Sequence, residues 1–200
     1  LLTNKKTTVY KEKSMNANLP VIPEYITVHL GAPDSAAQNV TLPFADYIKN
    51  VVSSEIYPTW PENAIRANAL AIISFALNRV YTEFYRTKGY NFDITNDTRV
   101  DQAFVKDRDI YENVGGIVDG IFNNYIVRNE KTEPLFAQFC NGTTSKCNGL
   151  SQWGTVPLAN SGKSPLEILK NYYGNDISIV TNAPVKSVSE SFDGIPLKLG

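Results

Sequence analysis

The sequence has 200 residues, of which 42% are hydrophobic and 20% are charged, and its formal net charge is −1. A chain of this length can bury one sizeable core, so we expect one principal folded domain. The near-neutral charge argues against nucleic acid as a partner, because nucleic-acid binders usually carry a basic excess. No run of residues approaches the ~18 apolar residues of a membrane span, so we expect no membrane partner.

The two ends of the chain differ in composition from its middle. Residues 1–20 are polar, mixed in charge and without hydrophobic periodicity, so we expect a linker or the remnant of a preceding segment. Residues 181–200 read as a second linker. The folded domain is therefore expected to occupy residues 21–180.

In chain order, the first expected element is a strand at 25–30, where apolar and polar residues alternate, followed by a turn at 31–34. A helix should begin after Pro43 and end before Pro58, because its apolar residues recur at helical spacing. These residues are Phe44, Tyr47, Ile48, Val51, Val52 and Ile56.

A second helix is expected to open at Thr59, which could form a capping box with Glu62. Between residues 64 and 77 its only polar residues are Arg66, Asn68 and Ser74. A helix that is apolar on nearly every side is normally buried, so this helix should lie at the centre of the domain.

The remaining elements are shorter. Residues 90–105 carry β-like pieces, and a third helix is expected at about 108–128. A loop of small and polar residues at 140–149 precedes a last helix, which should open with a capping box of Ser164 and Glu167 and end at Gly174. The patterns together predict an α+β fold, helix-rich, with a central buried helix and a small β component.

Two cysteines and one histidine restrict the possible chemistry. Catalysis by a Ser-His-Asp or Cys-His set would depend on His29 alone. Cys140 and Cys147 could form a disulfide, which is the plainest interpretation in an oxidising compartment. Two free thiols, a metal pair or, least favoured, a catalytic thiol are the alternatives.

Glu55 is the first residue whose position suggests a function, because it lies on the apolar face of its own helix, three residues after Val52. Such a carboxylate can be structural and paired with a buried cation, for which Arg66 is available. It can also be functional, because burial favours the protonated form and a protonated carboxyl is a general acid. Trp153 has a similar ambiguity, since it could line a sugar site or fill the core beneath a loop.

Four segments of the sequence carry a resemblance to the SpoIID/LytB family. Residues 42–56, LPFADYIKNVVSSEI, resemble a family motif in which a hydrophobic helix ends on a glutamate. Trp60-Pro61 and the Ala-rich segment after it also match, as do GLSQWG at 149–154 and ILKNYYG at 168–174. The resemblance extends over residues 25–180.

The resemblance implies a lytic transglycosylase that acts on peptidoglycan glycan strands with Glu55 as its catalytic residue and no cofactor. It would cleave the MurNAc-β-1,4-GlcNAc bond and leave 1,6-anhydro-MurNAc ends. The segments 21–26 and 47–50 are most similar to the spore cortex-lytic, SleC-like type, which implies action on the cortex or cell wall, outside the cell, during germination. Residues 181–200 would then lead to a peptidoglycan-binding domain. A protease that activates a precursor is a further candidate partner.

The motifs also suggest Arg66, Ser151 and Gln152 as residues that position the sugar, with Arg66 on the wall of the Glu55 cleft. The sequence departs from the family at Ile73, where the family has an arginine. A zinc-binding variant carries histidines near its cysteine loop, where this chain has Ala137 and Asn148, so we expect no metal.

Two other functions stay open at the level of sequence. One is a hydrolytic muramidase, which would need a second carboxylate near Glu55, such as Asp93 or Asp101. The other is a non-catalytic module that binds peptidoglycan.

Overall fold

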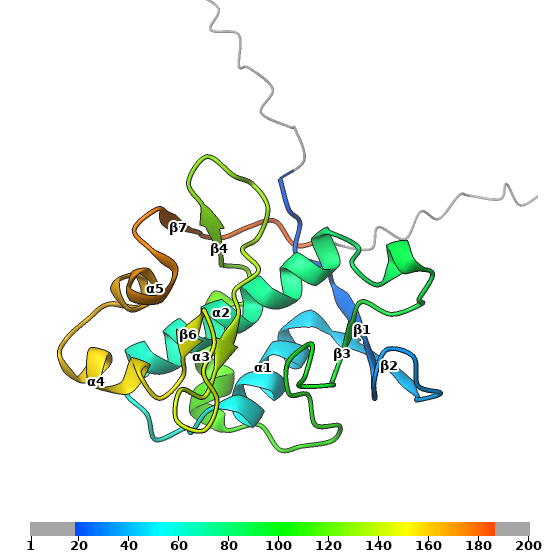
Figure 1. Ribbon diagram of the computed structural model, residues 1–200, viewed down its shortest axis with the longest axis horizontal. Helices are drawn as coiled ribbons and strands as arrows, with labels where there is room; N and C mark the ends of the chain where they lie inside the picture. The colour runs from blue at the N-terminus through cyan, green and yellow to red at the C-terminus, as the bar shows by residue number, and fades with distance from the viewer. Residues whose placement is uncertain (1–18, 187–200) are drawn as a thin grey trace, which may run out of the picture.

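Helix α2 (Glu62–Tyr81) runs through the middle of the molecule in the computed structural model (Figure 1). Its central residues, from Ala64 to Arg79, are buried with the exception of Arg66. Four helices pack against it: α1 (Phe44–Glu55), α3 (Glu112–Ile121), α4 (Thr155–Asn160) and α5 (Pro165–Tyr173). This arrangement confirms the predicted α+β domain with a central buried helix.

Residues 19–186 are the part of the chain that the structure describes. Nearly all of the predicted N-terminal linker and most of the predicted C-terminal one therefore lie outside the described residues. The segment after residue 180 still contacts the domain, since Ala183 N donates to Asn123 O (3.0 Å) and Lys186 N donates to Ile22 O (2.8 Å). The folded part of the chain thus continues to Lys186.

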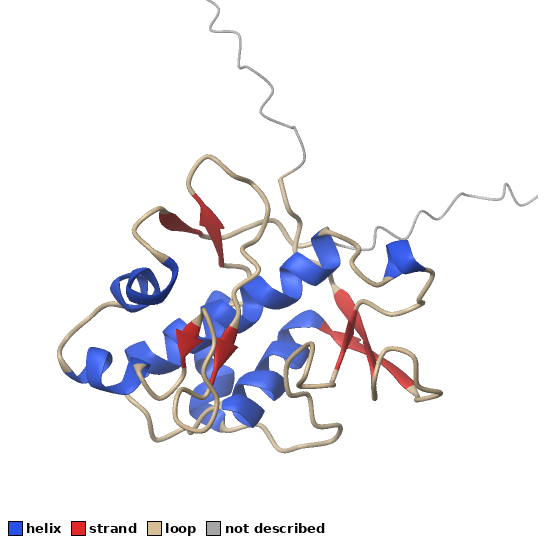
Figure 2. Ribbon diagram, in the orientation of Figure 1, coloured by secondary structure: helices blue, strands red, loops and turns tan. Residues whose placement is uncertain are grey.

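A three-stranded sheet lies at the N-terminal end of α1 (Figure 2). Strand β1 (Tyr25–His29) pairs antiparallel with β2 (Asn39–Pro43) and parallel with the short β3 (Ile94–Thr95). The predicted strand at 25–30 is confirmed, whereas only two residues of the predicted β region at 90–105 form a strand. The rest of that region is loop, and it forms one wall of the site described below.

Two smaller sheets contain two strands each. Strand β4 (Tyr125–Arg128) pairs antiparallel with β7 (Ile177–Val180), and β5 (Phe139–Cys140) pairs parallel with β6 (Leu150–Ser151). The predicted helix at 108–128 is therefore wrong at its C-terminal end. Helix α3 stops at Ile121, and Tyr125, Ile126 and Val127 are types that favour strands and find a partner in β7.

Helix α1 begins after Pro43 and ends at Glu55, as its periodicity predicts. Its apolar face, which includes Tyr47, Ile48, Val51 and Val52, is completely buried. Burying each large apolar side chain contributes roughly 1.5–3 kcal/mol, so this face fixes the rotation of α1 about its axis. The direction of the Glu55 side chain is fixed with it.

The two predicted capping boxes have different outcomes. Ser164 and Glu167 form the predicted box at the start of α5, where Ser164 Oγ accepts from Glu167 N (3.2 Å) and Glu167 Oε2 accepts from Ser164 N (2.8 Å). The box at Thr59 is wrong, because α2 begins later and Pro61 is its N-cap residue without a side-chain cap. Glu62 pairs with Arg66 on the next turn instead.

Helix α2 has 20 residues, but neither it nor any other helix in the described part of the chain is long and apolar enough to cross a membrane.

Candidate active site

Glu55 is the last residue of α1, and its carboxylate is held by two neutral donors from distant parts of the chain. Ala103 N donates to Oε1 (2.8 Å) and Gln152 Nε2 donates to Oε2 (3.0 Å). Both contacts are long-range, so tertiary contacts hold the carboxylate in the direction that the packing of α1 gives the side chain. No cation is among these partners.

The Glu55 carboxyl opens into a hollow of about 370 Å³ between α1 and two loops. This volume lies in the range of small-molecule sites. Neutral polar side chains supply much of the remaining lining. The hollow is lined by Glu55, Thr98, Asp101, Phe139, Cys140, Asn141, Ser145 and Gln152.

The surroundings of Glu55 favour its protonated form. Burial raises the pKa of the Glu55 carboxyl above its ordinary value, and the hydrogen bonds from Ala103 and Gln152 lower it by a smaller amount. The negative end of the α1 dipole also lies here, because Glu55 is the C-terminal residue of the helix. A carboxyl with a raised pKa next to an open hollow is suited to general acid catalysis.

Asp101 is the second carboxylate on the wall of the hollow, but its oxygens are already engaged. Arg79 Nε donates to Oδ1 (2.9 Å), while Tyr85 Oη (2.6 Å), Thr95 N (3.0 Å) and Thr95 Oγ1 (2.7 Å) donate to Oδ2. The Asp101 side chain is completely buried and that of Arg79 nearly so. Asp101 is therefore an internal anchor for α2 and the 95–101 loop.

Asp93, the other carboxylate considered from sequence, does not line the hollow. Its oxygens accept from Thr27 N (2.8 Å) and Arg86 Nε (2.7 Å), so it joins β1 to the segment after α2.

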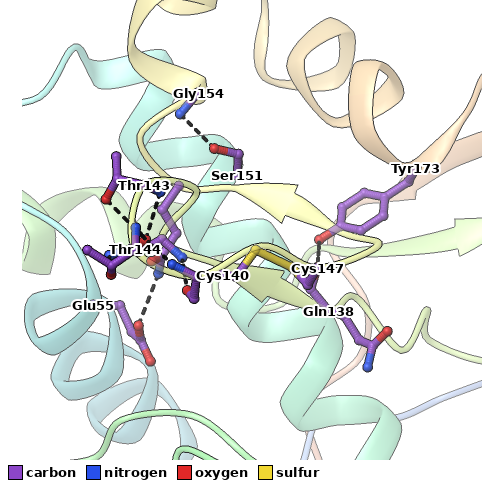
Figure 3. Close-up of a disulfide and its surroundings, with 12 residues drawn as sticks. Glu55, Gln138, Cys140, Thr143, Thr144, Cys147, Ser151, Gly154 and Tyr173 are labelled. Carbon is purple, nitrogen blue, oxygen red and sulfur yellow. Dashed lines mark hydrogen bonds between the residues drawn. A yellow bond between two sulfur atoms is a disulfide. The ribbon is translucent and has the colours of Figure 1, made fainter.

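The motif residues Ser151 and Gln152 face different parts of the structure. Gln152 is buried and contacts Glu55, whereas Ser151 Oγ accepts from Gly154 N (3.1 Å). Figure 3 shows the Ser151 side chain directed toward Gly154 and away from Glu55. Ser151 also lies against Gly142, where a Cβ atom would come within 1.8 Å of its Oγ and where φ is +85°. The position of Ser151 thus points to a role in packing the loop.

Cys140 and Cys147 are joined by a disulfide at the base of a loop that borders the hollow (Figure 3). Asn141 Oδ1 organises this loop by accepting from the backbone N atoms of Thr143 (2.8 Å), Thr144 (2.9 Å) and Ser145 (3.2 Å). The disulfide and the Asn141 contacts together hold Asn141 and Ser145 at the edge of the hollow.

His29 lies in the N-terminal sheet, where Nδ1 contacts Asn39 Oδ1 (2.7 Å) and the ring stacks on Phe92. Within residues 19–186, no group of three His, Cys, Asp or Glu side chains is arranged to hold a metal ion.

The prediction that Arg66 lies on the wall of the Glu55 cleft is wrong. Arg66 Nη2 pairs with Glu62 Oε1 (2.7 Å), one turn earlier on α2, and the side chain is about one-third exposed. It lines a different hollow with Trp60, Glu62 and Asn113. The sequence suggested burial because Arg66 is the only charged residue in an apolar stretch, but the first turns of α2 still reach solvent on this side.

Ile73, which stands where the family has an arginine, is completely buried in the apolar core and does not line the hollow. Ile73 itself therefore contributes no contact to this hollow.

Several residues of the hollow were not identified from the sequence. Ala103 contributes only its backbone N–H, Thr98 and Asn141 lie in loops without a periodic pattern, and Phe139 lies in the two-residue strand β5. Asn141 follows Cys140 directly, and this position next to a cysteine is the one local signal in the sequence that could have indicated Asn141 as a residue of the hollow.

Comparison with known protein families matches part of the chain. Residues 34–131 match the SpoIID family, described as stage II sporulation protein, so the match covers 98 of the 200 residues. No curated protein matches the chain closely enough to be reported as a relative. The family is a sporulation domain related to the cell wall, and the match is compatible with peptidoglycan lytic activity. Residues 34–131, which carry Glu55 at the end of α1, thus correspond to the SpoIID family domain.

Proposed function

We propose that this chain is a peptidoglycan lytic transglycosylase and that Glu55 is its single catalytic carboxyl. One observation carries the proposal: the hollow contains a carboxyl with a raised pKa that is held by Ala103 and Gln152 without a cation. The correspondence of residues 34–131 to a cell-wall-related family supplies the substrate class.

The proposed reaction uses the Glu55 carboxyl twice. Protonated Glu55 gives its proton to the glycosidic oxygen as the bond from that oxygen to the anomeric carbon of MurNAc breaks. The resulting carboxylate then takes the proton of the MurNAc C6 hydroxyl, whose oxygen bonds to the same anomeric carbon. The products are a 1,6-anhydro-MurNAc end and a free GlcNAc hydroxyl, and Glu55 is again protonated.

This route fits the hollow because it needs no second carboxylate to activate water. A hydrolytic muramidase requires a second carboxylate as base or nucleophile. Asp101 is the other carboxylate among the described residues that line the hollow, and four hydrogen bonds occupy it. Asp101 would have to give up its contact with buried Arg79 to act on water, which would leave an unpaired buried charge.

Gln152 has a positioning role in the proposed mechanism. Its amide is buried and donates to Glu55 Oε2, so it holds the carboxylate toward the hollow. Neutral polar groups of Thr98, Asn141 and Ser145 are available for the hydroxyl and acetamido groups of a sugar.

We place the activity outside the cell, on the peptidoglycan of the spore cortex or cell wall during germination. The disulfide between Cys140 and Cys147 supports an oxidising location, because such bonds are rare in reducing compartments. The resemblance of segments 21–26 and 47–50 to the spore cortex-lytic, SleC-like type supports the cortex as the substrate.

Mass spectrometry of peptidoglycan digested by the purified chain tests the proposal. We expect 1,6-anhydro-MurNAc ends, which are lighter than reducing ends by one water molecule. Reducing MurNAc ends would show a hydrolytic muramidase, and intact strands would show a non-catalytic binding module. Either of these results would overturn the transglycosylase assignment.

A further inference from the structure

Three aromatic rings form a cluster next to the Glu55 hollow, and we call Tyr57, Trp60 and Trp153 the aromatic platform. Their ring centroids are 5.9 Å (Tyr57–Trp60), 5.6 Å (Tyr57–Trp153) and 4.8 Å (Trp60–Trp153) apart, with tilted planes. These are favourable distances for aromatic pairs. Trp60 is nearly buried, whereas Tyr57 is 56% exposed and Trp153 is 42% exposed. One ring therefore supports two that face solvent.

The platform is joined directly to the groups that hold the catalytic carboxyl. Trp153 follows Gln152, whose amide donates to Glu55, and Tyr57 lies two residues after Glu55. Consecutive Cα atoms are about 3.8 Å apart, so the backbone of Tyr57 and Trp153 lies close to the residues that line this end of the hollow. Trp153 N also donates to Asn141 O (3.1 Å), and Trp60 N donates to Tyr57 O (3.2 Å), which fixes both backbones.

The composition of the platform fits a sugar ring better than a charged ligand. Its three side chains are neutral, and a Trp or Tyr ring offers a flat apolar face with one polar group at its edge. A pyranose ring has the complementary form, with an apolar C–H face and hydroxyl groups around its edge. Two large aromatic side chains that remain exposed beside a hollow with polar walls are typical of a binding surface.

A second hollow adjoins the first on the side formed by Thr98, Asp101 and Phe139, which line both. The platform adjoins the side formed by Glu55 and Gln152. The site therefore continues beyond the Glu55 hollow in two directions, as a polymeric ligand requires.

We propose that the aromatic platform is a sugar subsite, in which Trp153 and Tyr57 stack on a pyranose ring of the glycan strand adjacent to the sugar at Glu55. The inference rests on the proposed function, because that function places a glycan strand in the hollow. Aromatic side chains at binding surfaces often supply a large share of the affinity. We expect the platform to bind the strand and to contribute little to the chemical step.

The test measures binding in the Glu55→Gln chain, so that cleavage does not consume the ligand. Glycan strands freed of peptides by an amidase, and a chitin hexasaccharide, are the two probes. Both tryptophans of the chain lie in the platform, so intrinsic tryptophan fluorescence reports on it alone. We expect each probe to change this emission and to protect it from acrylamide quenching.

Calorimetric titration then gives Kd for variants that lack a ring. Trp153→Ala and Tyr57→Ala, each in the Glu55→Gln chain, should weaken binding about tenfold, equivalent to about 1.4 kcal/mol. Trp153→Phe, which keeps a ring, should recover most of the affinity. The matched control is Tyr25→Ala, because Tyr25 is 50% exposed and pairs with Pro43 just before the other end of α1, roughly 16 Å from Glu55 along the axis.

Unchanged Kd values for Trp153→Ala and Tyr57→Ala, equal losses in Tyr25→Ala, or no binding of either probe would each overturn the inference. Circular dichroism verifies that the variants are folded. If the wild-type chain produces anhydro ends while the platform variants bind normally, the subsite alone is wrong. If binding depends on the platform but no strand is cleaved, the subsite stands and the enzyme assignment is wrong.

Discussion

Glu55 and Asp101 line the same hollow, yet their surroundings give them different roles. Two neutral donors hold Glu55, whereas four hydrogen bonds, one from buried Arg79, hold Asp101. Burial raises the pKa of the Glu55 carboxyl, and no cation contacts Glu55 to oppose that effect, whereas the contacts of Asp101 join it to Arg79, Tyr85 and Thr95. These different partners favour the proposed acid role for Glu55 and an anchoring role for Asp101.

The largest expected effect is that of Glu55→Gln on cleavage. Glutamine keeps the volume and can accept one of the two hydrogen bonds but cannot transfer a proton, so the rate should fall about 10²–10⁴-fold. The rate is measured as the release of soluble fragments from sacculi, with circular dichroism to verify the fold. Activity near that of wild type in a folded variant would show that Glu55 is not the acid.

The same variant should change stability in a pH-dependent way. Because the pKa of Glu55 is raised in the fold, its ionisation above the ordinary glutamate pKa of about 4.3 costs stability, and glutamine avoids this cost. We expect Glu55→Gln to unfold at a higher temperature than wild type near neutral pH, and the difference to vanish below pH ~4. A lower Tm for the variant at pH 7 would contradict the raised pKa.

Asp101→Asn should affect stability more than any other substitution in the hollow. It leaves the Arg79 charge buried without its partner, which costs about 3–5 kcal/mol in the free energy of unfolding. Denaturant titration measures this, with Asp176→Asn as the matched control, because the exposed pair of Arg128 and Asp176 should contribute less than about 1 kcal/mol. Equal losses of unfolding free energy in both variants would show that Asp101 is no stronger an anchor than the exposed Asp176.

Removal of the disulfide should have an intermediate effect. A sequence separation of seven residues corresponds to roughly 2.5 kcal/mol in the chain-entropy model. Cleavage should also slow several-fold after Cys140→Ser with Cys147→Ser, because Asn141 and Ser145 lose their fixed place at the hollow. Thermal unfolding and the cleavage assay, with and without a thiol reductant, measure both effects. Metal analysis of the same preparations tests the prediction that no zinc is bound.

Gln152→Ala should shift the pH profile of cleavage. The amide of Gln152 lowers the pKa of Glu55, so its removal should raise that pKa further and extend activity of the acid form to higher pH. The lost positioning should reduce the maximal rate at the same time. Gln38→Ala, at an exposed loop position just before β2, is the control. A reduced rate without any shift in the profile would limit Gln152 to a structural role.

The smallest expected effect is that of Arg66→Ala, which removes a partly exposed pair on α2 outside the hollow. Stability should change by no more than about 0.5 kcal/mol, and cleavage should stay close to that of wild type. A tenfold loss of cleavage in a folded variant would show that Arg66 does belong to the substrate site.

Sequence patterns predicted the helices well where periodicity and caps determine them. The apolar face of α1 predicted the position of Glu55. The long apolar stretch in α2 predicted the central helix, and Ser164 and Glu167 predicted the start of α5. The walls of the hollow were less predictable, because Ala103 acts through its backbone and Asn141 lies in a loop without a period. Such contacts depend on which loops meet in three dimensions.

Two errors have the same physical origin. Arg66 was expected in the cleft and residues 122–128 in a helix, because both inferences extended a local pattern beyond the point where tertiary contacts replace it. The strand partner β7 determines the structure of residues 125–128, and the exposed start of α2 gives Arg66 a partner in Glu62.

Digestion of peptidoglycan in water enriched with heavy oxygen tests the central claim most directly, that one carboxyl cleaves the strand without water. We predict MurNAc ends in the anhydro form, with no heavy oxygen incorporated during cleavage, and no such ends from the Glu55→Gln chain. Reducing MurNAc ends that carry one heavy oxygen from the first turnovers would show that water attacks the anomeric carbon, and would contradict the account.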